Sequence, residues 1–221
     1  MNEFEQIEKS IKKIPRGKIF FPESIYKKYL VENAVKVLAY LAKKGEIKRV
    51  MRGMYVRPKK CRYLKGEILM PGSYEIVKAI SKKTGEVISE HGADAVNRVG
   101  LSAQVPMRAV YYTTGRSRKI KINEKFRIRL VHINPKKLVM PGTVTGLVVT
   151  ALWYLRGDGA SLVTPLAIKK IHHRIENKNF VEVLKHLDKM PVWMKRVFVQ
   201  YKNMQPDDPL LIEDLNAYYQ G

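Results

Sequence analysis

The chain has 221 residues, enough for one large or two small domains, and its 45% hydrophobic content is sufficient to bury a core. Lys and Arg number 42 against 20 Asp and Glu, which gives a net charge of +22 and a pI near 10.0. Such an excess attracts polyanions, and the lack of a strongly apolar amphipathic helix disfavours a membrane surface as the partner. The composition therefore favours a nucleic-acid-binding protein.

The cysteine content and the lack of a long apolar segment indicate the cellular compartment. Cys61 is the only cysteine, which excludes an intramolecular disulfide and a cysteine-based metal site. The first ten residues mix acidic and polar side chains, unlike a secretory signal, and the most apolar segment, 146–155, is too short to span a bilayer. We therefore expect a cytoplasmic protein with no membrane partner.

The first 66 residues carry the pattern of a winged helix-turn-helix. Helices are predicted at 3–13 and 23–30, with a short strand at 19–21 between them. A third helix begins with Asn33 as N-cap and ends before Gly45. Its predicted buried stripe consists of Val35, Leu38 and Leu41.

A basic hairpin follows the third helix. Strands are predicted at 47–50 and 54–56, on either side of a turn at Arg52-Gly53. A short helix followed directly by a basic hairpin is typical of a winged helix, in which the helix enters the DNA major groove and the wing reaches a neighbouring groove or the backbone. We place the end of this domain near residue 66, so that the predicted domains are 1–66 and 67–221.

The candidate DNA-binding residues lie on the third helix and the wing. They are Lys36, Tyr40 and Lys43 on the helix, Lys48, Arg49, Arg52 and Arg57 on the wing, and Lys59 just beyond it. Arg is best suited to reading guanine, and the remaining side chains are expected on phosphates. The alternative is structural, because lysines favour a helix C-terminus and a basic hairpin can be a solvated surface.

The second predicted domain, 67–221, is mixed and ends in helices, so the overall fold class is α+β. A helix at 73–83 and one at 91–99 flank a short strand at 86–89. Strands at 110–114 and 119–122 enclose a turn at 115–117, and 126–133 alternates like a half-buried antiparallel strand. Further helices are predicted at 144–155, 164–175, 178–188 and 191–203.

No pattern in the chain predicts catalysis, a metal site or a cofactor. The adjacent His172 and His173 point about 100° apart on a helix, so one core and one surface histidine are expected instead of a chelating pair. His91 has no nucleophile motif nearby, and the glycines match no phosphate-binding loop. A second surface that could contact nucleic acid or a protein, or could be structural, consists of Tyr112, Arg116, Arg118, Lys119 and Lys121.

Two segments of the chain are distinctive, 45–58 (GEIKRVMRGMYVRP) and 88–122 (ISEHGADAVNRVGLSAQVPMRAVYYTTGRSRKIKI). The first resembles the wing of the AbiEi-type antitoxins of type IV toxin–antitoxin systems, and the second resembles the core of that family's second domain. The resemblance spans roughly residues 5 to 135.

The resemblance implies an antitoxin and autorepressor without catalysis of its own. Its winged helix would bind inverted repeats in its own promoter, and its second domain would neutralise a cognate nucleotidyltransferase-like toxin, for which a stable complex is not required. Two other readings stay open: a nucleic-acid-processing enzyme that uses the winged helix for docking, and a nucleic-acid-binding module with no toxin partner.

Overall fold

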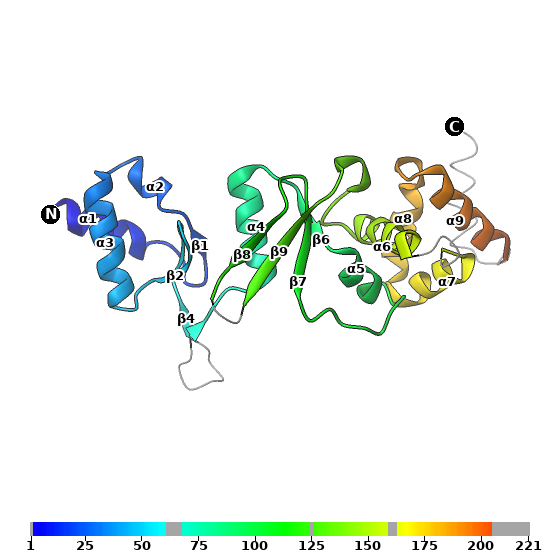
Figure 1. The fold of residues 1–221 in the computed structure, drawn as a ribbon, viewed down its shortest axis with the longest axis horizontal. Helices are drawn as coiled ribbons and strands as arrows, with labels where there is room; N and C mark the ends of the chain where they lie inside the picture. The colour runs from blue at the N-terminus through cyan, green and yellow to red at the C-terminus, as the bar shows by residue number, and fades with distance from the viewer. Residues whose placement is uncertain (1, 61–67, 124–125, 159–162, 205–221) are drawn as a thin grey trace. The chain divides into compact units, whose positions relative to one another are not determined.

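The computed structural model describes residues 2–60, 68–123, 126–158 and 163–204 (Figure 1). Helices are combined with sheets of three, two and four strands, so the predicted α+β class is confirmed. The pattern of contacts between residues divides the chain into two compact units. The first contains the chain up to Gly85 together with Lys121–Arg127, and the second contains Glu86–Ile120 and the chain from Ile128 onward.

The first unit has the element order and sheet of a winged helix. Its antiparallel sheet has the order β1-β3-β2, with Ile19 and Lys48 both paired to Val56. The elements are α1 (Glu3–Lys12), β1 (Ile19–Phe20), α2 (Glu23–Tyr26), α3 (Val31–Lys43), β2 (Lys48–Met51), β3 (Met54–Val56), β4 (Lys59–Lys60), β5 (Ile68–Leu69) and α4 (Ser73–Thr84).

The core of this winged helix is formed where α1 and α2 pack against α3. Ala34, Val37, Leu38 and Leu41 are buried on α3, spaced at i, i+3, i+4 and i+7. The predicted stripe is therefore right for Leu38 and Leu41 and wrong for Val35, which is 49% exposed. Ala34 is buried, and because successive residues of a helix are rotated by about 100°, Val35 lies outside the buried side.

The start of α3 also differs from the prediction. The helix begins at Val31, and the cap comes from α1 instead of Asn33: the Glu3 carboxylate accepts hydrogen bonds from the Leu30 amide at 2.9 Å and from the Asn33 side-chain amide at 2.5 Å. A residue distant in sequence thus satisfies the helix terminus.

Helix α4 belongs to the first unit. It packs on β1, and its Lys83 ammonium lies 2.5 Å from the Glu23 carboxylate and 4.5 Å from the centre of the Phe21 ring. The domain boundary predicted near residue 66 falls in segment 61–67, outside the described residues. By contacts the units divide instead at Gly85, which ends α4 with a φ of +74°.

The second unit contains a four-stranded sheet and a helical layer. Its elements are β6 (Ile88–Glu90), α5 (Gly92–Arg98), β7 (Ala109–Thr113), β8 (Arg118–Lys121), β9 (Arg127–His132), a 3-10 helix (Pro135–Lys137), α6 (Val144–Asp158), α7 (Pro165–Arg174), α8 (Asn177–Lys185), a second 3-10 helix (Leu187–Lys189) and α9 (Val192–Met204). By contacts Lys121 and Arg127 count with the first unit, although they end β8 and begin β9.

The strand order is β6-β7-β9-β8, so β9 lies between the two strands that precede it in the chain. It runs parallel to β7, with Ala109 opposite Ile128 and Thr113 opposite His132. The predicted alternation is confirmed, because the buried Ile128 and Leu130 alternate with the exposed Arg127 and Arg129 and with Val131, which is partly exposed. The pairing with β7, however, is parallel.

The helical layer has its own core, built from residues of α5 to α9 that include Val148, Leu152, Phe180 and Phe198. Helices α5 and α6 approach so closely that a Cβ at Gly92 would stand 2.4 Å from the Tyr154 Cβ. Within the described ranges, no helix has both the length and the apolar character needed to cross a bilayer.

Candidate nucleic-acid interface

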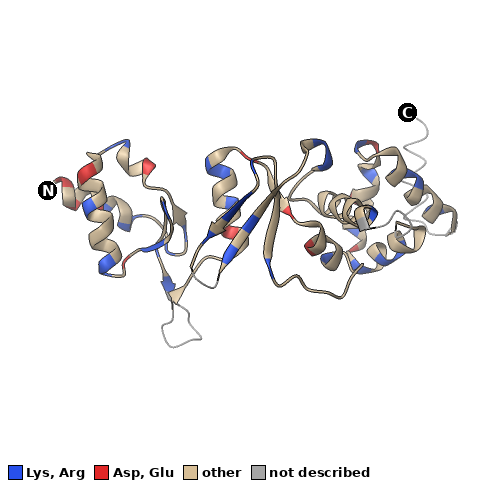
Figure 2. Ribbon diagram, in the orientation of Figure 1, with Lys and Arg blue, Asp and Glu red and all other residues tan. Residues whose placement is uncertain are grey.

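The outward side of α3 exposes the three predicted helix residues. Lys36, Tyr40 and Lys43 are all exposed, opposite the buried side that packs on α1. Figure 2 colours the Lys and Arg positions along the ribbon blue, those of α3 among them. Tyr40 is 38% exposed because its ring packs edge-on against Phe4 at 5.3 Å, and the Lys44 ammonium lies 4.4 Å from its centre. Tyr40 is therefore anchored at the margin of the face, and the two lysines project from it.

The hairpin of β2 and β3 presents the basic side chains predicted for the wing. Lys48 and Arg49 are exposed, whereas Val50 is buried, and a register shift lies between Arg49 and Met51. Arg52 is exposed at the turn, where Gly53 adopts a φ of +73° that other residues rarely take. The wing thus carries three exposed cations within five positions.

Arg57 has a different role from the one predicted for it. Its guanidinium donates to the carbonyl oxygens of Lys12 and Ile14, the latter at 2.5 Å, just after α1 ends. These carbonyls have no partner within the helix, and a cation there is also favoured by the helix dipole. Arg57 therefore ties β3 to α1 and lies apart from the exposed wing residues.

Three further lysines of the first unit are exposed. Lys59 is exposed on β4, and its aliphatic stem lies beside Gly17. Lys27 and Lys28, which the sequence analysis did not single out, are exposed directly after α2. Their only signal in the sequence is the lysine pair itself.

The second predicted surface is divided by the structure. Tyr112 packs its ring on His91, with 4.7 Å between centres, and lines a small cavity of about 80 Å³ with Lys137, Trp153 and Tyr154. Arg116, Lys119 and Lys121 are exposed, whereas Arg118 lies on the same side of β8 as the buried Ile120. The five residues therefore do not form one platform.

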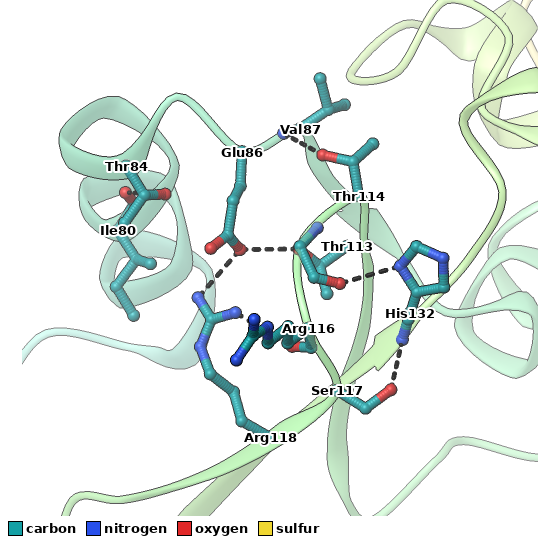
Figure 3. Close-up of polar contacts among 11 residues, drawn as sticks. Ile80, Thr84, Glu86, Val87, Thr113, Thr114, Arg116, Ser117, Arg118 and His132 are labelled. Atoms are coloured by element: carbon teal, nitrogen blue, oxygen red, sulfur yellow. Dashed lines mark hydrogen bonds and ion pairs between the residues drawn. The ribbon is translucent and has the colours of Figure 1, made fainter.

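Arg118 holds a polar network around Glu86 (Figure 3). The Glu86 carboxylate accepts hydrogen bonds from the Thr113 hydroxyl at 2.8 Å and from the Arg118 guanidinium at 2.9 Å. Burial raises the pKa of Glu86, but the hydrogen bonds and charge of its partners outweigh burial, so that its pKa lies below the usual value. A Cβ at Gly115 would stand 2.2 Å from the carboxylate carbon, so the turn after β7 is closed over this network.

The far side of the same turn is fixed to β9. The backbone amide of His132 donates to the Ser117 hydroxyl at 2.8 Å, and the His132 ring Nδ1 lies 2.9 Å from the Gly115 carbonyl oxygen (Figure 3). Ser117 and His132 are thus used to shape the turn, and the side chain of Arg116 is presented outward from it.

The two adjacent histidines of α7 have different surroundings. His172 stacks on Phe180 at 4.0 Å and its Nδ1 lies 2.9 Å from the Tyr201 hydroxyl, whereas His173 is exposed, so the predicted division of this pair is confirmed. Burial, with the nearby Arg129 charge, lowers the pKa of His91. Among the residues that the structure describes, no three His, Cys, Asp or Glu side chains are placed to hold a metal ion.

Comparison with known families places the chain in a family but does not give its activity. Residues 6–186 match the model of DUF6088, a family of unknown function. The chain belongs to this family. No curated protein and no solved structure gives a match. The DUF6088 region includes nearly all of the first unit and the second unit as far as residue 186, so that α9 lies outside it. The winged helix and the sheet with its network are therefore parts of one family region.

Proposed function

We propose that this protein binds double-stranded promoter DNA through α3 and the β2–β3 wing, represses its own operon, and acts as the antitoxin of a nucleotidyltransferase-like toxin in the cytoplasm. The observation that carries the DNA-binding part is the set of exposed cations on a winged-helix scaffold. These cations are Lys36 and Lys43 on α3 and Lys48, Arg49 and Arg52 on the wing.

The winged-helix scaffold supports a division of roles, in which α3 reads base edges and the wing holds the DNA backbone. Helix α3 of 13 residues is about 20 Å long, enough to lie in a major groove. On the wing, Lys48 and Arg49 lie on β2 and Arg52 lies in the short turn after it, from where they can reach a phosphate backbone or an adjacent groove. If all five cations contact phosphates, the logarithm of the association constant should fall with the logarithm of salt concentration with a slope of about 4.5.

The antitoxin part rests on the resemblance of segments 45–58 and 88–122 to the AbiEi-type antitoxins. The second of these segments contains the Thr113 to Arg118 turn, which the Glu86 network holds in one shape. A turn fixed in this way can present Arg116 and Lys119 to a partner without a large loss of conformational entropy. The toxin would supply the enzymology, and this chain would have none.

The DNA-binding part is tested by a gel-shift titration on the fragment directly upstream of the gene, against scrambled DNA of equal length, at near-physiological salt. We expect binding to the upstream fragment to be tighter by a factor of about 10³ or more. Equal binding to both fragments would rule out autorepression.

The antitoxin part is tested by co-expression with the neighbouring gene. The wild-type chain should restore growth, and Arg52→Ala should restore it equally while losing operator affinity. Loss of protection by a folded, abundant Arg52→Ala variant would show that the division of labour between the two units is wrong. A neighbouring gene product that is harmless alone would exclude the antitoxin role.

A further inference from the structure

The N-terminal half of α3 exposes apolar side chains beside the face that carries Lys36 and Lys43. Val31 and Val35 are 53% and 49% exposed, and they lie one helical turn apart on the same side. Leu30, directly before the helix, is 68% exposed. Leu30, Val31 and Val35 thus form a small exposed apolar patch at the start of the helix, next to its lysines.

This half of the helix is unsuited to phosphate. Helix N-termini commonly bind anions, but here the Glu3 carboxylate already occupies that position by accepting from the Leu30 amide. Glu32, next to Val31, is exposed and adds a second negative charge. A phosphate brought to this end would meet two carboxylates, so the cations that anchor the backbone lie further along, at Lys36, Lys43 and the wing.

The apolar surface is also too small for a stable dimer. Three aliphatic side chains bury far less than the roughly 800 Å² per partner that a stable protein–protein interface requires. In the major groove, by contrast, the C5-methyl group of thymine is the one apolar feature of the base edges, and small aliphatic side chains are suited to contact it.

We propose that Val31 and Val35 read thymine methyl groups in the major groove, so that the preferred DNA site contains thymines that α3 recognises by their methyl group. This inference rests on the proposed DNA binding and adds its specificity. Successive residues of a helix point about 100° apart, so Val31 and Val35 lie to one side of Lys36. A helix held on the phosphate backbone by its lysines would then turn the two valines toward neighbouring base edges.

The experiment begins with selection of the preferred site from a random duplex library by the full-length protein. Each thymine of that site is then replaced singly by uracil, which removes only the methyl group and keeps the base pairing. We expect one or two positions at which the replacement weakens binding about fourfold, the value for one buried carbon, and no change elsewhere.

The same titrations with Val31→Ala and Val35→Ala assign the methyl contacts to residues. Each variant should bind the thymine and uracil forms of its own position almost equally. Alanine raises helix propensity and both sites are exposed, so the variants should fold, which far-UV circular dichroism checks. The matched control is Val192→Ala, because Val192 is likewise an exposed valine at the first position of a helix, α9.

The outcomes separate the inference from the function on which it rests. If selection yields no preferred site, the proposed sequence-specific DNA binding fails. A preferred site that tolerates uracil at every thymine overturns the methyl readout alone. Uracil sensitivity that persists in both alanine variants assigns the methyl contact to another residue, and a change of sedimentation coefficient in these variants identifies the surface as a contact between copies; either result overturns the inference.

Discussion

Replacement of Arg57 by alanine should lower the stability of the first unit, whereas replacement of Arg52 should lower only DNA affinity. Arg57 donates to two carbonyl oxygens at the end of α1, and Arg52 stands exposed at the tip of the wing. Hydrogen bonds from a charged donor contribute about 1.5–3 kcal/mol, and a cation at a helix C-terminus adds a few tenths to 1 kcal/mol. We expect Arg57→Ala to lower the free energy of unfolding by about 2 kcal/mol.

The two tryptophans make this effect separable in one urea titration. Trp153 and Trp193 both lie in the second unit, so tryptophan fluorescence follows that unit alone, whereas far-UV circular dichroism follows both. Arg57→Ala should shift the part of the circular dichroism transition that belongs to the first unit and leave the fluorescence transition in place. Arg57→Lys should recover only part of the loss, because an ammonium cannot match the two-pronged geometry of a guanidinium.

Arg52→Ala provides the matched control on the same hairpin. Its unfolding curves should coincide with those of the wild type, and its salt slope for DNA binding should be lower by about 0.9. If Arg57→Ala instead unfolded like the wild type and lowered the salt slope by this amount, Arg57 would be a phosphate contact and our assignment of its role would be refuted.

Two further predictions concern the second unit. Gly92→Ala should destabilise it by about 3 kcal/mol, because the new methyl group would overlap Tyr154 and force α5 away from α6. Glu86→Gln should remove part of the acid sensitivity of the second unit. The folded pKa of Glu86 is below 4.5, so its stabilising ion pair with Arg118 is present above the unfolded pKa and is lost as pH falls through the folded value.

Each of these two predictions has a control variant in the same unit. Gly157→Ala on α6 meets no atom within 4 Å and should be neutral or slightly stabilising, so equal losses at both glycines would refute the packing argument. Glu176→Gln, which removes an exposed carboxylate beside Lys178, is the control for the loss of one negative charge at the surface. Acid unfolding curves of wild type and Glu86→Gln that coincide would show that the network has no such role.

The first unit was largely predictable because its elements are local. Hydrophobic periodicity, the Gly45 stop and the turn at Arg52-Gly53 determine α3 and the wing within about 25 residues, and the structure has the winged-helix order that they indicate. The misassigned helix cap and the misassigned role of Arg57 come from contacts distant in sequence. Glu3 caps α3 in place of Asn33, and Arg57 serves α1 instead of a ligand; both pairs are separated by about thirty residues or more.

In the second unit the sequence pattern predicted the strands better than it predicted how they pair. Alternation in β9 correctly gave its two sides, but alternation carries no information about which strand is the neighbour or in which direction it runs. The same holds for Arg118. Its place in a run of basic residues suggested a surface contact, whereas its partner Glu86 lies 32 positions earlier.

The position of β9 between β7 and β8 has a consequence for how the chain acquires its fold. During synthesis β7 and β8 are complete before β9 exists, and the short turn between them would let them pair as an ordinary hairpin. The final sheet requires that pairing to be absent or to be undone, so that β9 can enter. We therefore expect a refolding phase slower than closure of a local hairpin. We also expect the Glu86 network, which fixes the turn after β7, to direct β8 away from β7, the strand that precedes it in the chain.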